Sequence, residues 1–504
     1  MKSLLRFVSA VAICFSGWAL APFVGLPTEA FGWERFADAY SLIHRSVIPA
    51  AAVATGAEDA FFQTGVDINN TGSGGEALYE FWWLPRGSDN SSPRRSEIFS
   101  LGGGQSVRVE NVLTEIFGLQ PDQAGAVMIV SDSDRVIAMS RTYNVSQGAG
   151  TGTFGQALPA VPTDELITAG ETRRIIFFSE NARTRGNLGC VNGAESDVEI
   201  EVDLYDAGGA HLGATTMALG PWGNRQINRI FRGHEPVNGY VDVRSNTPGA
   251  SYYCYGSVLD NATSDPTTIL PQTPSSGTTY FVPAAALASG AAGSFFQTDV
   301  DINNIGQATT FVFRWLPRGE DNSSPMQSSP ISLGSGMSTR YENVLSRVFS
   351  LAPGAVGALT IQAQSANLLV MSRTYNLDGG LTAGTFGQAL PGVQEGDMIR
   401  AGERRRIVFL SQNGEFRSNV GCVNATDEDI EIDIEIYDDS GDRRDRIRME
   451  LDPWSNDQIN RIMQPFAPTN GYVDVSSDTT GALFYCYGSL LDNNTSDPTS
   501  IAPR

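Results

Sequence analysis

The second half of the chain repeats the first half almost motif for motif. The stretch YYCYGSVLDNATSDPT at residues 252–267 returns as FYCYGSLLDNNTSDPT at residues 484–499, which is 232 positions later (486 − 254 for the shared cysteine). Other motifs recur in the same order, among them SRTYN, GTFGQALP, GCVN and NGYVDV. The offset is 234 up to Asn70 and 232 from Trp83 onward, so a two-residue deletion lies in a predicted surface loop between them. The fold of the first half is therefore expected to occur again in the second half.

Each half also divides into two related units. One unit opens with a strand T-x-V-D-I-N-N and ends at SRTYN, and the other opens with N-x-G-C-V-N and ends at L-D-N. Residues 198–206, VEIEVDLYD, alternate apolar and acidic side chains, as do residues 430–438, IEIDIEIYD. Alternation with period two indicates strands that have one buried and one solvated face. The pattern predicts an all-β protein of four tandem immunoglobulin-like β-sandwich domains, arranged as two repeats of a two-domain unit, with a short N-terminal helical segment.

The predicted domain limits follow from the repeat and from the composition of the connecting segments. The stretch PQTPSSGTT between the halves is typical of a linker. We expect each sandwich to enclose a hydrophobic core of its own. The predicted organisation is a signal peptide at 1–22, an amphipathic helical segment at 23–46, β-sandwich 1 at 47–160, β-sandwich 2 at 161–270, a linker at 271–279, β-sandwich 3 at 280–392 and β-sandwich 4 at 393–504.

The N-terminus has the pattern of an export signal. Two cations, Lys2 and Arg6, precede an apolar stretch that Pro22 interrupts, which is typical of a secretory signal peptide; the alternative is a retained anchor. Residues 28–45 then place large apolar side chains at three- and four-residue intervals, as an amphipathic helix does. The contact candidates in this segment are Trp33, Phe36 and Tyr40. We expect the helix to dock on the first sandwich or to contact another chain.

Four cysteines remain after Cys14, which lies in the apolar N-terminal stretch. Four cysteines allow three pairings, and the repeat selects one. Cys190 and Cys254 are as far apart as Cys422 and Cys486, 64 positions in each half (254 − 190 and 486 − 422). A bond that was duplicated with its domain is expected to lie inside that domain, and it requires an oxidising compartment. Each closed loop should stabilise its sandwich by about 4 kcal/mol on the chain-entropy account.

Sandwiches 1 and 3 carry apolar residues at the aligned cysteine positions. The aligned pairs are Ile68 with Ile137 and Ile302 with Leu369. We expect each pair to meet across the core of its sandwich. Arg141 and Arg373, in the SRTYN motif, then fall on the same inward face, where a cation needs a partner. The candidate partners are Glu110 and Glu342 in the repeated ENVL motif.

The charge balance excludes one class of partner. Formal net charge is −22, and Lys2 is the only lysine, so arginine supplies nearly all cations. A surface this acidic repels a phosphate backbone, which argues against nucleic acid. Acidic ladders lie on the wet faces of two predicted strands and are typical of solvated faces, with a cationic partner as the alternative. Their members are Glu199, Glu201 and Asp203, and Glu431, Asp433 and Glu435.

The recurring turn LDNxTSDPT is a candidate metal site. Its carboxylate and amide oxygens suit a hard cation such as Ca²⁺. The residues concerned are Asp260, Asn261 and Asp265 in the first half and Asp492, Asn493 and Asp497 in the second. The alternative is that these side chains bond their own backbone and close the last hairpin. Apart from calcium at this turn, the sequence predicts no cofactor.

Three tryptophans are candidates for carbohydrate contact, because aromatic rings stack on sugar faces. Trp82 is predicted to point outward from its strand, and Trp222 and Trp454 follow prolines in loop-like segments. The second half has Arg314 at the position of Trp82. The alternative is that these rings pack beneath the rim of the sandwich.

The motifs SRTYN followed by GTFGQ, and R-x-N-x-G-x-V-N followed by D-N-x-T-x-D-P-T, also carry a family resemblance. They resemble paired β-sandwich modules that occur in many secreted proteins of environmental bacteria, often beside extracellular hydrolase domains. The resemblance covers residues 46–502. It implies secretion and a modular fold, and it implies no active site.

Catalysis has little support in the sequence. His211 and His234 align with Arg443 and Phe466, so neither histidine recurs in the second half, and no G-x-S-x-G or H-E-x-x-H motif occurs. We therefore expect an extracellular or surface-displayed, non-enzymatic structural or adhesive protein, with self-association or a glycan or cell-surface partner. The alternative is an extracellular carbohydrate-binding protein, and a glycoside hydrolase is the remote alternative.

Overall fold

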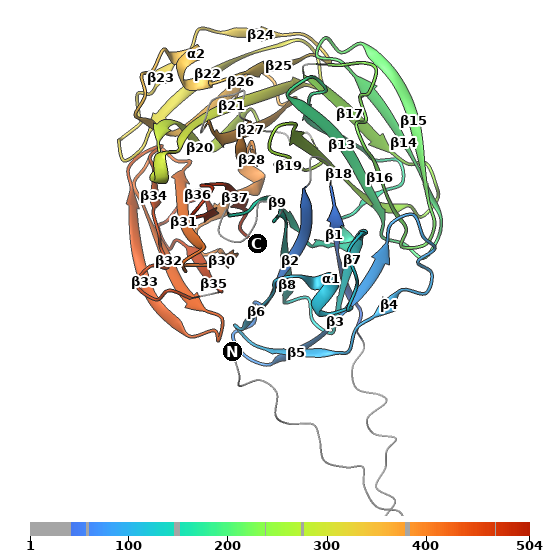
Figure 1. Cartoon of the computed structure of the whole chain (residues 1–504). Coiled ribbons are helices and arrows are strands. Elements are labelled where there is room, and N and C mark those ends of the chain that lie inside the picture. Colours follow the sequence, from blue (N-terminus) through green and yellow to red (C-terminus); the bar gives the residue numbers. More distant parts are fainter. Residues whose placement is uncertain are drawn as a thin grey trace, which may run out of the picture. The chain divides into compact units, whose positions relative to one another are not determined.

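The computed structural model describes residues 42–56, 60–145, 152–236, 238–273, 277–377, 384–468 and 470–504. Strands make up 57% of the structure and helices 4%, which confirms the all-β class (Figure 1). In the described ranges no helix is long and apolar enough to cross a membrane. The predicted signal peptide and Trp33, Phe36 and Tyr40 lie outside those ranges. Residues 44–46, predicted to end the helical segment, instead begin the first strand.

The strands form four successive units, which we call modules 1 to 4. Module 1, residues 44–162, is a single antiparallel sheet of ten strands. The strands are β1 (His44–Thr55), β2 (Phe61–Asn70), β3 (Glu76–Pro85), β4 (Arg94–Arg95), β5 (Phe99–Gly102), β6 (Ser106–Val109), β7 (Gln123–Ser131), β8 (Val136–Asn144), β9 (Phe154–Pro159) and β10 (Val161–Pro162), with helix α1 (Val112–Glu115). Their order is β4-β3-β7-β1-β2-β8-β9, with β5 on β3, β6 on β2 and β10 on β1. A register shift between Ile48 and Ala51 of β1 marks a bulge, where a strand can bend and carry the sheet around a core.

Module 3 repeats this arrangement with nine strands. The strands are β20 (Thr279–Ser289), β21 (Phe295–Asn304), β22 (Thr309–Pro317), β23 (Met326–Gln327), β24 (Ile331–Leu333), β25 (Ser338–Tyr341), β26 (Ala355–Ala363), β27 (Leu368–Asn376) and β28 (Phe386–Pro391), with helix α2 (Val344–Phe349) and the short 3₁₀ turn η3 (Ala291–Gly293). The order is β23-β22-β26-β20-β21-β27-β28. The bulge recurs in β20, between Val282 and Ala285.

Modules 2 and 4 each pair a five-stranded sheet with a four-stranded sheet. Module 2 has the turn η2 (Thr163–Glu165) and strands β11 (Ile167–Thr168), β12 (Thr172–Phe178), β13 (Thr184–Asn192), β14 (Val198–Tyr205), β15 (His211–Leu219), β16 (Asn224–Ile227), β17 (Gly239–Arg244), β18 (Ser251–Asp260) and β19 (Pro266–Ile269). Module 4 has the turn η4 (Glu395–Asp397) and strands β29 (Ile399–Arg400), β30 (Arg404–Leu410), β31 (Phe416–Asn424), β32 (Ile430–Asp438), β33 (Arg443–Leu451), β34 (Asn456–Ile459), β35 (Gly471–Ser476), β36 (Leu483–Asp492) and β37 (Pro498–Ile501). The sheet orders in module 2 are β11-β18-β13-β16, with β19 on β18, and β12-β17-β14-β15. Those in module 4 are β29-β36-β31-β34, with β37 on β36, and β30-β35-β32-β33.

The cysteine pairing predicted from the repeat is confirmed. Cys190 bonds Cys254, and Cys422 bonds Cys486, each with its Cα atoms 4.1 Å apart. The two cysteines of each bond face each other on neighbouring strands of one sheet. In the immunoglobulin class the bond instead joins two sheets.

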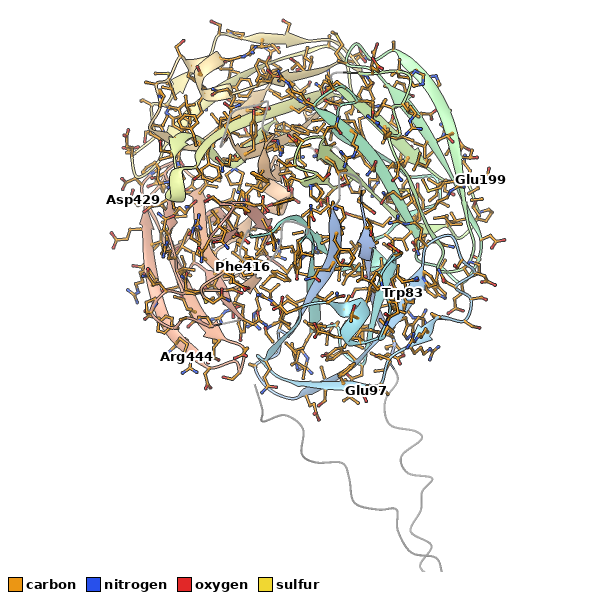
Figure 2. The ribbon with its side chains drawn as sticks, viewed as in Figure 1. Trp83, Glu97, Glu199, Phe416, Asp429 and Arg444 are labelled. Atoms are coloured by element: carbon orange, nitrogen blue, oxygen red, sulfur yellow. A yellow bond between two sulfur atoms is a disulfide. The ribbon has the colours of Figure 1, made fainter. Side chains whose placement is uncertain are left out.

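The expectation of four separate cores holds for modules 1 and 3 only. Trp83, labelled in Figure 2, belongs to the core of module 1, and Trp315 belongs to that of module 3. The core of module 2 continues into module 3 through Leu369 and Met371, and the core of module 4 continues into module 1 through Met139.

The register of β8 explains this correction. Ile68 of β2 lies opposite Ala138, one residue away from Ile137. An offset of one residue turns a side chain to the other face of a sheet. Ile137 therefore packs against the core of module 4, and Leu369 packs in the core of module 2. The predicted contacts of Ile137 with Ile68 and of Leu369 with Ile302 across one core are wrong.

Contacts between the modules are of two kinds. Modules 1 and 2 share one apolar cluster, and modules 3 and 4 share another. Modules 2 and 3 meet through Leu369 and Met371 and also through polar groups, where Arg174 Nη1 donates to Asn303 Oδ1 over 2.9 Å. Modules 4 and 1 meet in the same way, where Arg406 Nη1 donates to Asn69 Oδ1 over 2.8 Å. Residues 42–504 form one compact unit, so the predicted domain limits stay predictions.

Candidate functional site

The repeated motifs meet one another across the contacts between modules. Arg141, the arginine of SRTYN on β8, reaches the turn of module 4. Its Nη2 donates to Asp497 Oδ2 over 3.3 Å and its Nε donates to Thr499 Oγ1 over 2.9 Å. Its Nη1 donates to Thr153 Oγ1 of the GTFGQ motif over 2.8 Å. The arginine is 2% exposed and Asp497 is fully buried, so this is a desolvated ion pair.

The second half builds an equivalent junction, in which module 3 supplies the arginine and module 2 supplies the turn. Arg373 of module 3 donates from Nη2 to Asp265 Oδ2 of module 2 over 3.4 Å and from Nε to Thr267 Oγ1 over 2.9 Å. Its Nη1 donates to Thr385 Oγ1 over 3.0 Å. We call the two clusters the motif junctions, defined by Arg141, Thr153, Asp492 and Asp497, and by Arg373, Thr385, Asp260 and Asp265.

The predicted partners of the two arginines are wrong. The side chain of Glu342 pairs with Arg347, and the backbone carbonyl of Glu110 accepts a hydrogen bond from the Tyr143 hydroxyl. Arg141 and Arg373 lie on the face of their strands that meets the neighbouring module, so their acids come from another module. A contact between residues 356 positions apart leaves no local spacing signal. Thr153 and Thr385 were missed for the same reason.

Asp260 and Asp492 bond the threonine of the GTFGQ motif of another module. Asp492 Oδ2 accepts hydrogen bonds from Thr153 N over 2.7 Å and from Thr153 Oγ1 over 3.0 Å. Asp492 Oδ1 accepts bonds from the backbone of its own turn, at Asn494 and Thr495. Asp260 makes the equivalent bonds with Thr385. The turn thus bonds its own backbone, as the alternative expected, and also bonds a neighbouring module.

The predicted calcium site stays a prediction. Asn261 and Asn493 direct their side-chain oxygens to Arg185 and Arg417. Asp265 and Asp497 each keep one buried oxygen, Oδ1, that accepts no hydrogen bond. Over the described ranges, no group of three or more histidine, cysteine, aspartate or glutamate residues is arranged to hold a metal ion.

Burial dominates the electrostatics of the junctions. It raises the pKa of Asp497, and the Arg141 guanidinium lowers it only in part. Burial also raises the pKa of Asp265 well above its usual range, and the neighbouring Asp497 carboxylate raises it further. The two junctions are therefore close enough for their carboxyl groups to repel each other.

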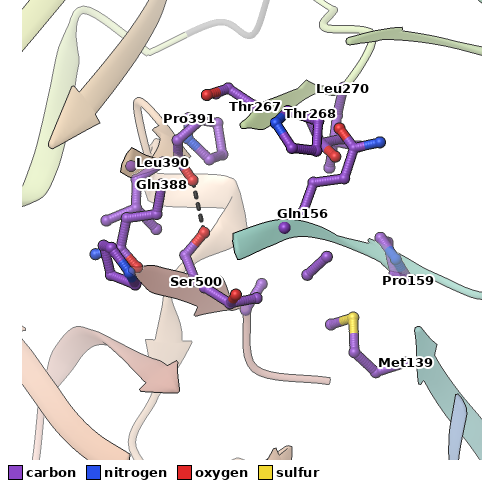
Figure 3. Close-up of a pocket in the computed structure, with 18 of the residues that line it drawn as sticks. Met139, Gln156, Pro159, Thr267, Thr268, Leu270, Gln388, Leu390, Pro391 and Ser500 are labelled. Atoms are coloured by element: carbon purple, nitrogen blue, oxygen red, sulfur yellow. Dashed lines mark hydrogen bonds between the residues drawn. The ribbon is translucent and has the colours of Figure 1, made fainter. Parts of the chain in front are cut away.

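The strands that carry GTFGQ and DPT from both halves line one small cavity (Figure 3). The cavity has a volume of about 110 Å³, and Gln156, Gln388, Leu390 and Met139 contribute to its walls. Ser500 Oγ donates to the carbonyl of Ala389 over 2.7 Å across one side. This volume is below the range of about 300–1,000 Å³ that is usual for ligand pockets, so we regard the cavity as a packing gap.

Trp82 points away from the core of module 1, as predicted, but it is covered by module 2 and not exposed to solvent. Trp82 is 5% exposed and Trp222 is 4% exposed, and their rings meet edge to face at 6.2 Å in the apolar contact between modules 1 and 2. Trp454 is half-buried and stacks on Phe281 at 6.1 Å in the contact between modules 3 and 4. The three rings hold modules together, as the packing alternative expected. Trp82 and Trp222 are buried and offer no free face to a sugar.

The acidic ladders are largely neutralised within their own sheets. Glu199 and Arg444, labelled in Figure 2, lie on β14 and β33. Arginines of β33 cover the second ladder, where Arg446 bonds both oxygens of Asp433 over 2.7 and 2.5 Å. In the first ladder, Arg244 pairs with Glu201 over 2.7 Å.

No family model and no curated protein matches the chain. One similar solved structure is a tetra-tandem repeat in the extending region of a large adhesion protein, 10% identical over 86% of this chain and 92% of that chain, with a TM-score of 0.10. Another is the Streptomyces avermitilis alpha-L-rhamnosidase complexed with L-rhamnose, 10% identical over 89% and 57%, with a TM-score of 0.11. A third is trypsin-activated alpha-2-macroglobulin from Escherichia coli, 7% identical over 91% and 41%, with a TM-score of 0.10. Similarities at these TM-scores carry no argument about function.

Proposed function

We propose that the chain is an exported, non-catalytic structural or adhesive protein built from tandem sandwich-like modules. The observation that carries this proposal is the use of the repeated motifs. SRTYN, GTFGQ and LDNxTSDPT supply buried contacts between modules, where Arg141 meets Asp497 and Arg373 meets Asp265. The repeated residues make contacts between modules, and no reactive group is repeated with them. We therefore infer that the repeat serves to hold the modules in a fixed arrangement.

Two further observations support export. The two disulfides favour an oxidising compartment, and the N-terminal pattern favours a secretory signal. The motif resemblance to paired modules of secreted bacterial proteins points in the same direction. The immunoglobulin-like assignment of the modules belongs to this proposal, with the difference in disulfide position described above.

The test is expression of the full chain in a bacterium with an oxidising periplasm. We expect mass spectrometry to find the protein outside the cytoplasm, with both disulfides formed and the N-terminal apolar stretch removed. Sizing and electron micrographs of the mature protein then measure self-association, and binding to whole cells measures adhesion. Protein that stays in the cytoplasm with all five thiols free would refute export. Turnover of a polysaccharide that one carboxylate substitution abolishes would refute the non-catalytic assignment.

A further inference from the structure

Two pockets of nearly the same construction lie where module 1 meets module 2 and where module 3 meets module 4. Their volumes are about 400 and 470 Å³, which is within the usual range for small-molecule sites. Three arginines at equivalent positions of the repeat line both pockets, and Arg232 is a fourth arginine in the first pocket. The equivalent arginines are Arg86, Arg185 and Arg229 in the first pocket and Arg318, Arg417 and Arg461 in the second. Among the described lining residues, neither pocket contains an aspartate or a glutamate.

This concentration of positive charge is unusual in a chain of net charge −22. Arg417 is 6% exposed, and its guanidinium bonds neutral acceptors: the Asp492 carbonyl, Asn493 Oδ1 and Ser496 Oγ. Burial and the nearby Arg461 lower the pKa of Arg417, and the Asp492 carboxylate offsets them only in part. The buried Nε of Arg318 has no hydrogen-bond partner in the described part of the chain. Buried cations usually have an anionic partner, so the second pocket has an unmet requirement for negative charge.

The remaining polar groups are fixed before any ligand arrives. Gln226 Oε1 accepts hydrogen bonds from the Tyr255 hydroxyl and from Arg86 Nη2, both over 3.2 Å. Gln226 Nε2 donates to Asn228 Oδ1 over 2.6 Å. The second pocket repeats the tyrosine and asparagine bonds, at 2.9 and 2.7 Å, around Gln458.

Two small residues make room for this arrangement. The Tyr255 ring lies so close to Gly189 that a Cβ at that position would be 2.4 Å from the ring, and Gly421 stands in the same relation to Tyr487. Alanines of β1 and β20 also line the pockets, where larger side chains would take up part of the space. The glycine of the repeated GCVN motif is thereby explained.

We propose that each pocket binds the carboxylate of an acidic sugar, that is, a uronic acid unit. Guanidinium groups match a carboxylate in charge and in planar two-point geometry. The amides and hydroxyls of Gln226, Asn228, Tyr255 and their counterparts suit the hydroxyls of a sugar ring. Exposed residues at the rim, Asn228 and Arg232, leave the first pocket open to solvent and to a longer chain. One molecule then holds two glycan segments.

Titration calorimetry on the full mature chain with intact disulfides tests this proposal. The probes are trimers of galacturonate, mannuronate and guluronate, each compared with its methyl ester, which keeps the skeleton and removes the charge. We expect two sites per chain for at least one trimer and at least tenfold weaker binding of its ester. Failure of all three trimers, or equal binding of the esters, would overturn the proposal. So would inorganic sulfate that displaces the trimer at equal concentration, because the pockets would then be plain anion sites.

Substitutions assign the two sites. Arg318→Gln should leave one site per chain, and the double variant Arg86→Gln with Arg318→Gln should leave none. Arg225→Gln is the matched control, because Arg225 is exposed on the same strand as Gln226 and does not line the pocket. Thermal melting checks that each variant is folded. Wild-type binding by the folded double variant would overturn the proposal.

The two copies differ at one informative position. Arg229 Nε donates to Glu180 Oε1 over 2.7 Å, whereas Gln412 occupies the position of Glu180 in the second copy. Glu180 competes with a ligand carboxylate for Arg229. Glu180→Gln should therefore raise the affinity of the first pocket for the trimer about fivefold. Gln412→Glu should lower the affinity of the second pocket by a similar factor. Each swap installs the residue of the other copy, so its cost in folding is small, and unchanged affinities in both would contradict the assigned orientation of the ligand.

Discussion

At the scale of single residues, the molecule contains buried aspartates whose pKa is raised because burial disfavours the charged carboxylate. Asp67, in the contact between modules 4 and 1, is fully buried and accepts a hydrogen bond from Arg108 Nη2 over 3.0 Å. Burial outweighs Arg108 and raises the pKa of Asp67 to about 6. Asp301 occupies the equivalent position beside Arg340, and its pKa is also raised by burial. These carboxyl groups take up protons more readily in the folded protein than in the unfolded chain.

The sign of the pH dependence follows from this shift. A pKa that is higher in the folded state gives stability that is complete below the unfolded value of 3.8 and is lost as pH rises through about 6. The loss is about 3 kcal/mol for Asp67. We therefore expect the free energy of unfolding, measured by urea titration, to be higher at pH 4.5 than at pH 7.5.

Asp67→Asn should make the free energy of unfolding less dependent on pH. It also replaces the ion pair with Arg108 by a weaker, neutral contact. Asp89→Asn is the control, because hydrogen bonds from Ser91 lower the pKa of this exposed carboxyl, which places its titration below the window. A wild-type protein whose stability instead rises from pH 4.5 to pH 7.5 would contradict the assigned shift.

At the scale of elements, sequence periodicity located the strands that have one wet face. The predicted strand at 430–438 is β32 as observed, and that at 198–206 is β14 within one residue. Alternation fails for β8 and β27, because both of their faces are buried, one in the core of the module and one against a neighbour. The sequence pattern of such a strand could therefore not show which face of β8 carries Ile137. Trp82 and Trp83 illustrate the same limit, since adjacent tryptophans are buried on opposite faces of β3.

The candidate site was predictable only in part for a related reason. The repeat identified the turn around Asp265 and Asp497 as important, and it identified Arg141 and Arg373 as cations in need of an acid. Their partners come from other modules, and no property of one repeat specifies which copy of the partner is used. The pocket arginines were missed because Arg86, Arg185 and Arg229 are scattered over three strands or loops and converge only when two modules meet.

The disulfides allow a prediction at this scale. Cys190 and Cys254 lie within a nine-pair ladder between β13 and β18, which the loss of the bond leaves in place. Replacement of both cysteines by alanine should therefore keep the fold and lower the free energy of unfolding by up to about 4 kcal/mol, the loop-closure term for 64 residues. Calorimetry measures the loss, and the same change at Cys422 and Cys486 is the matched comparison. No loss in either variant would contradict a loop-closure role for these bonds.

At the scale of the whole molecule, the modules between residues 42 and 504 are joined in a closed circuit of contacts. Modules 2 and 3 meet at Arg174, which bonds Asp242 and Asn303, and modules 4 and 1 meet at Arg406, which bonds Asp474 and Asn69. The two contacts are copies of one another. They differ in covalent connection, because a short segment joins β19 to β20, whereas modules 2 and 3 separate module 4 from module 1 along the chain.

This difference makes the two contacts unequal when the same bond is removed from each. Arg174→Gln removes the main partner of the partly buried Asp242, and Arg406→Gln removes the main partner of the buried Asp474, which keeps a contact with Arg404 over 3.3 Å. After Arg174→Gln the linker still holds modules 2 and 3 at high effective concentration, so their contact should reform readily. After Arg406→Gln no linker assists modules 4 and 1, so hydrogen exchange at β6 and β30 should accelerate more than exchange at β12 and β25 does in Arg174→Gln. Equal acceleration in the two variants would show that the covalent linker contributes nothing, and that the packing of the modules alone keeps the circuit closed.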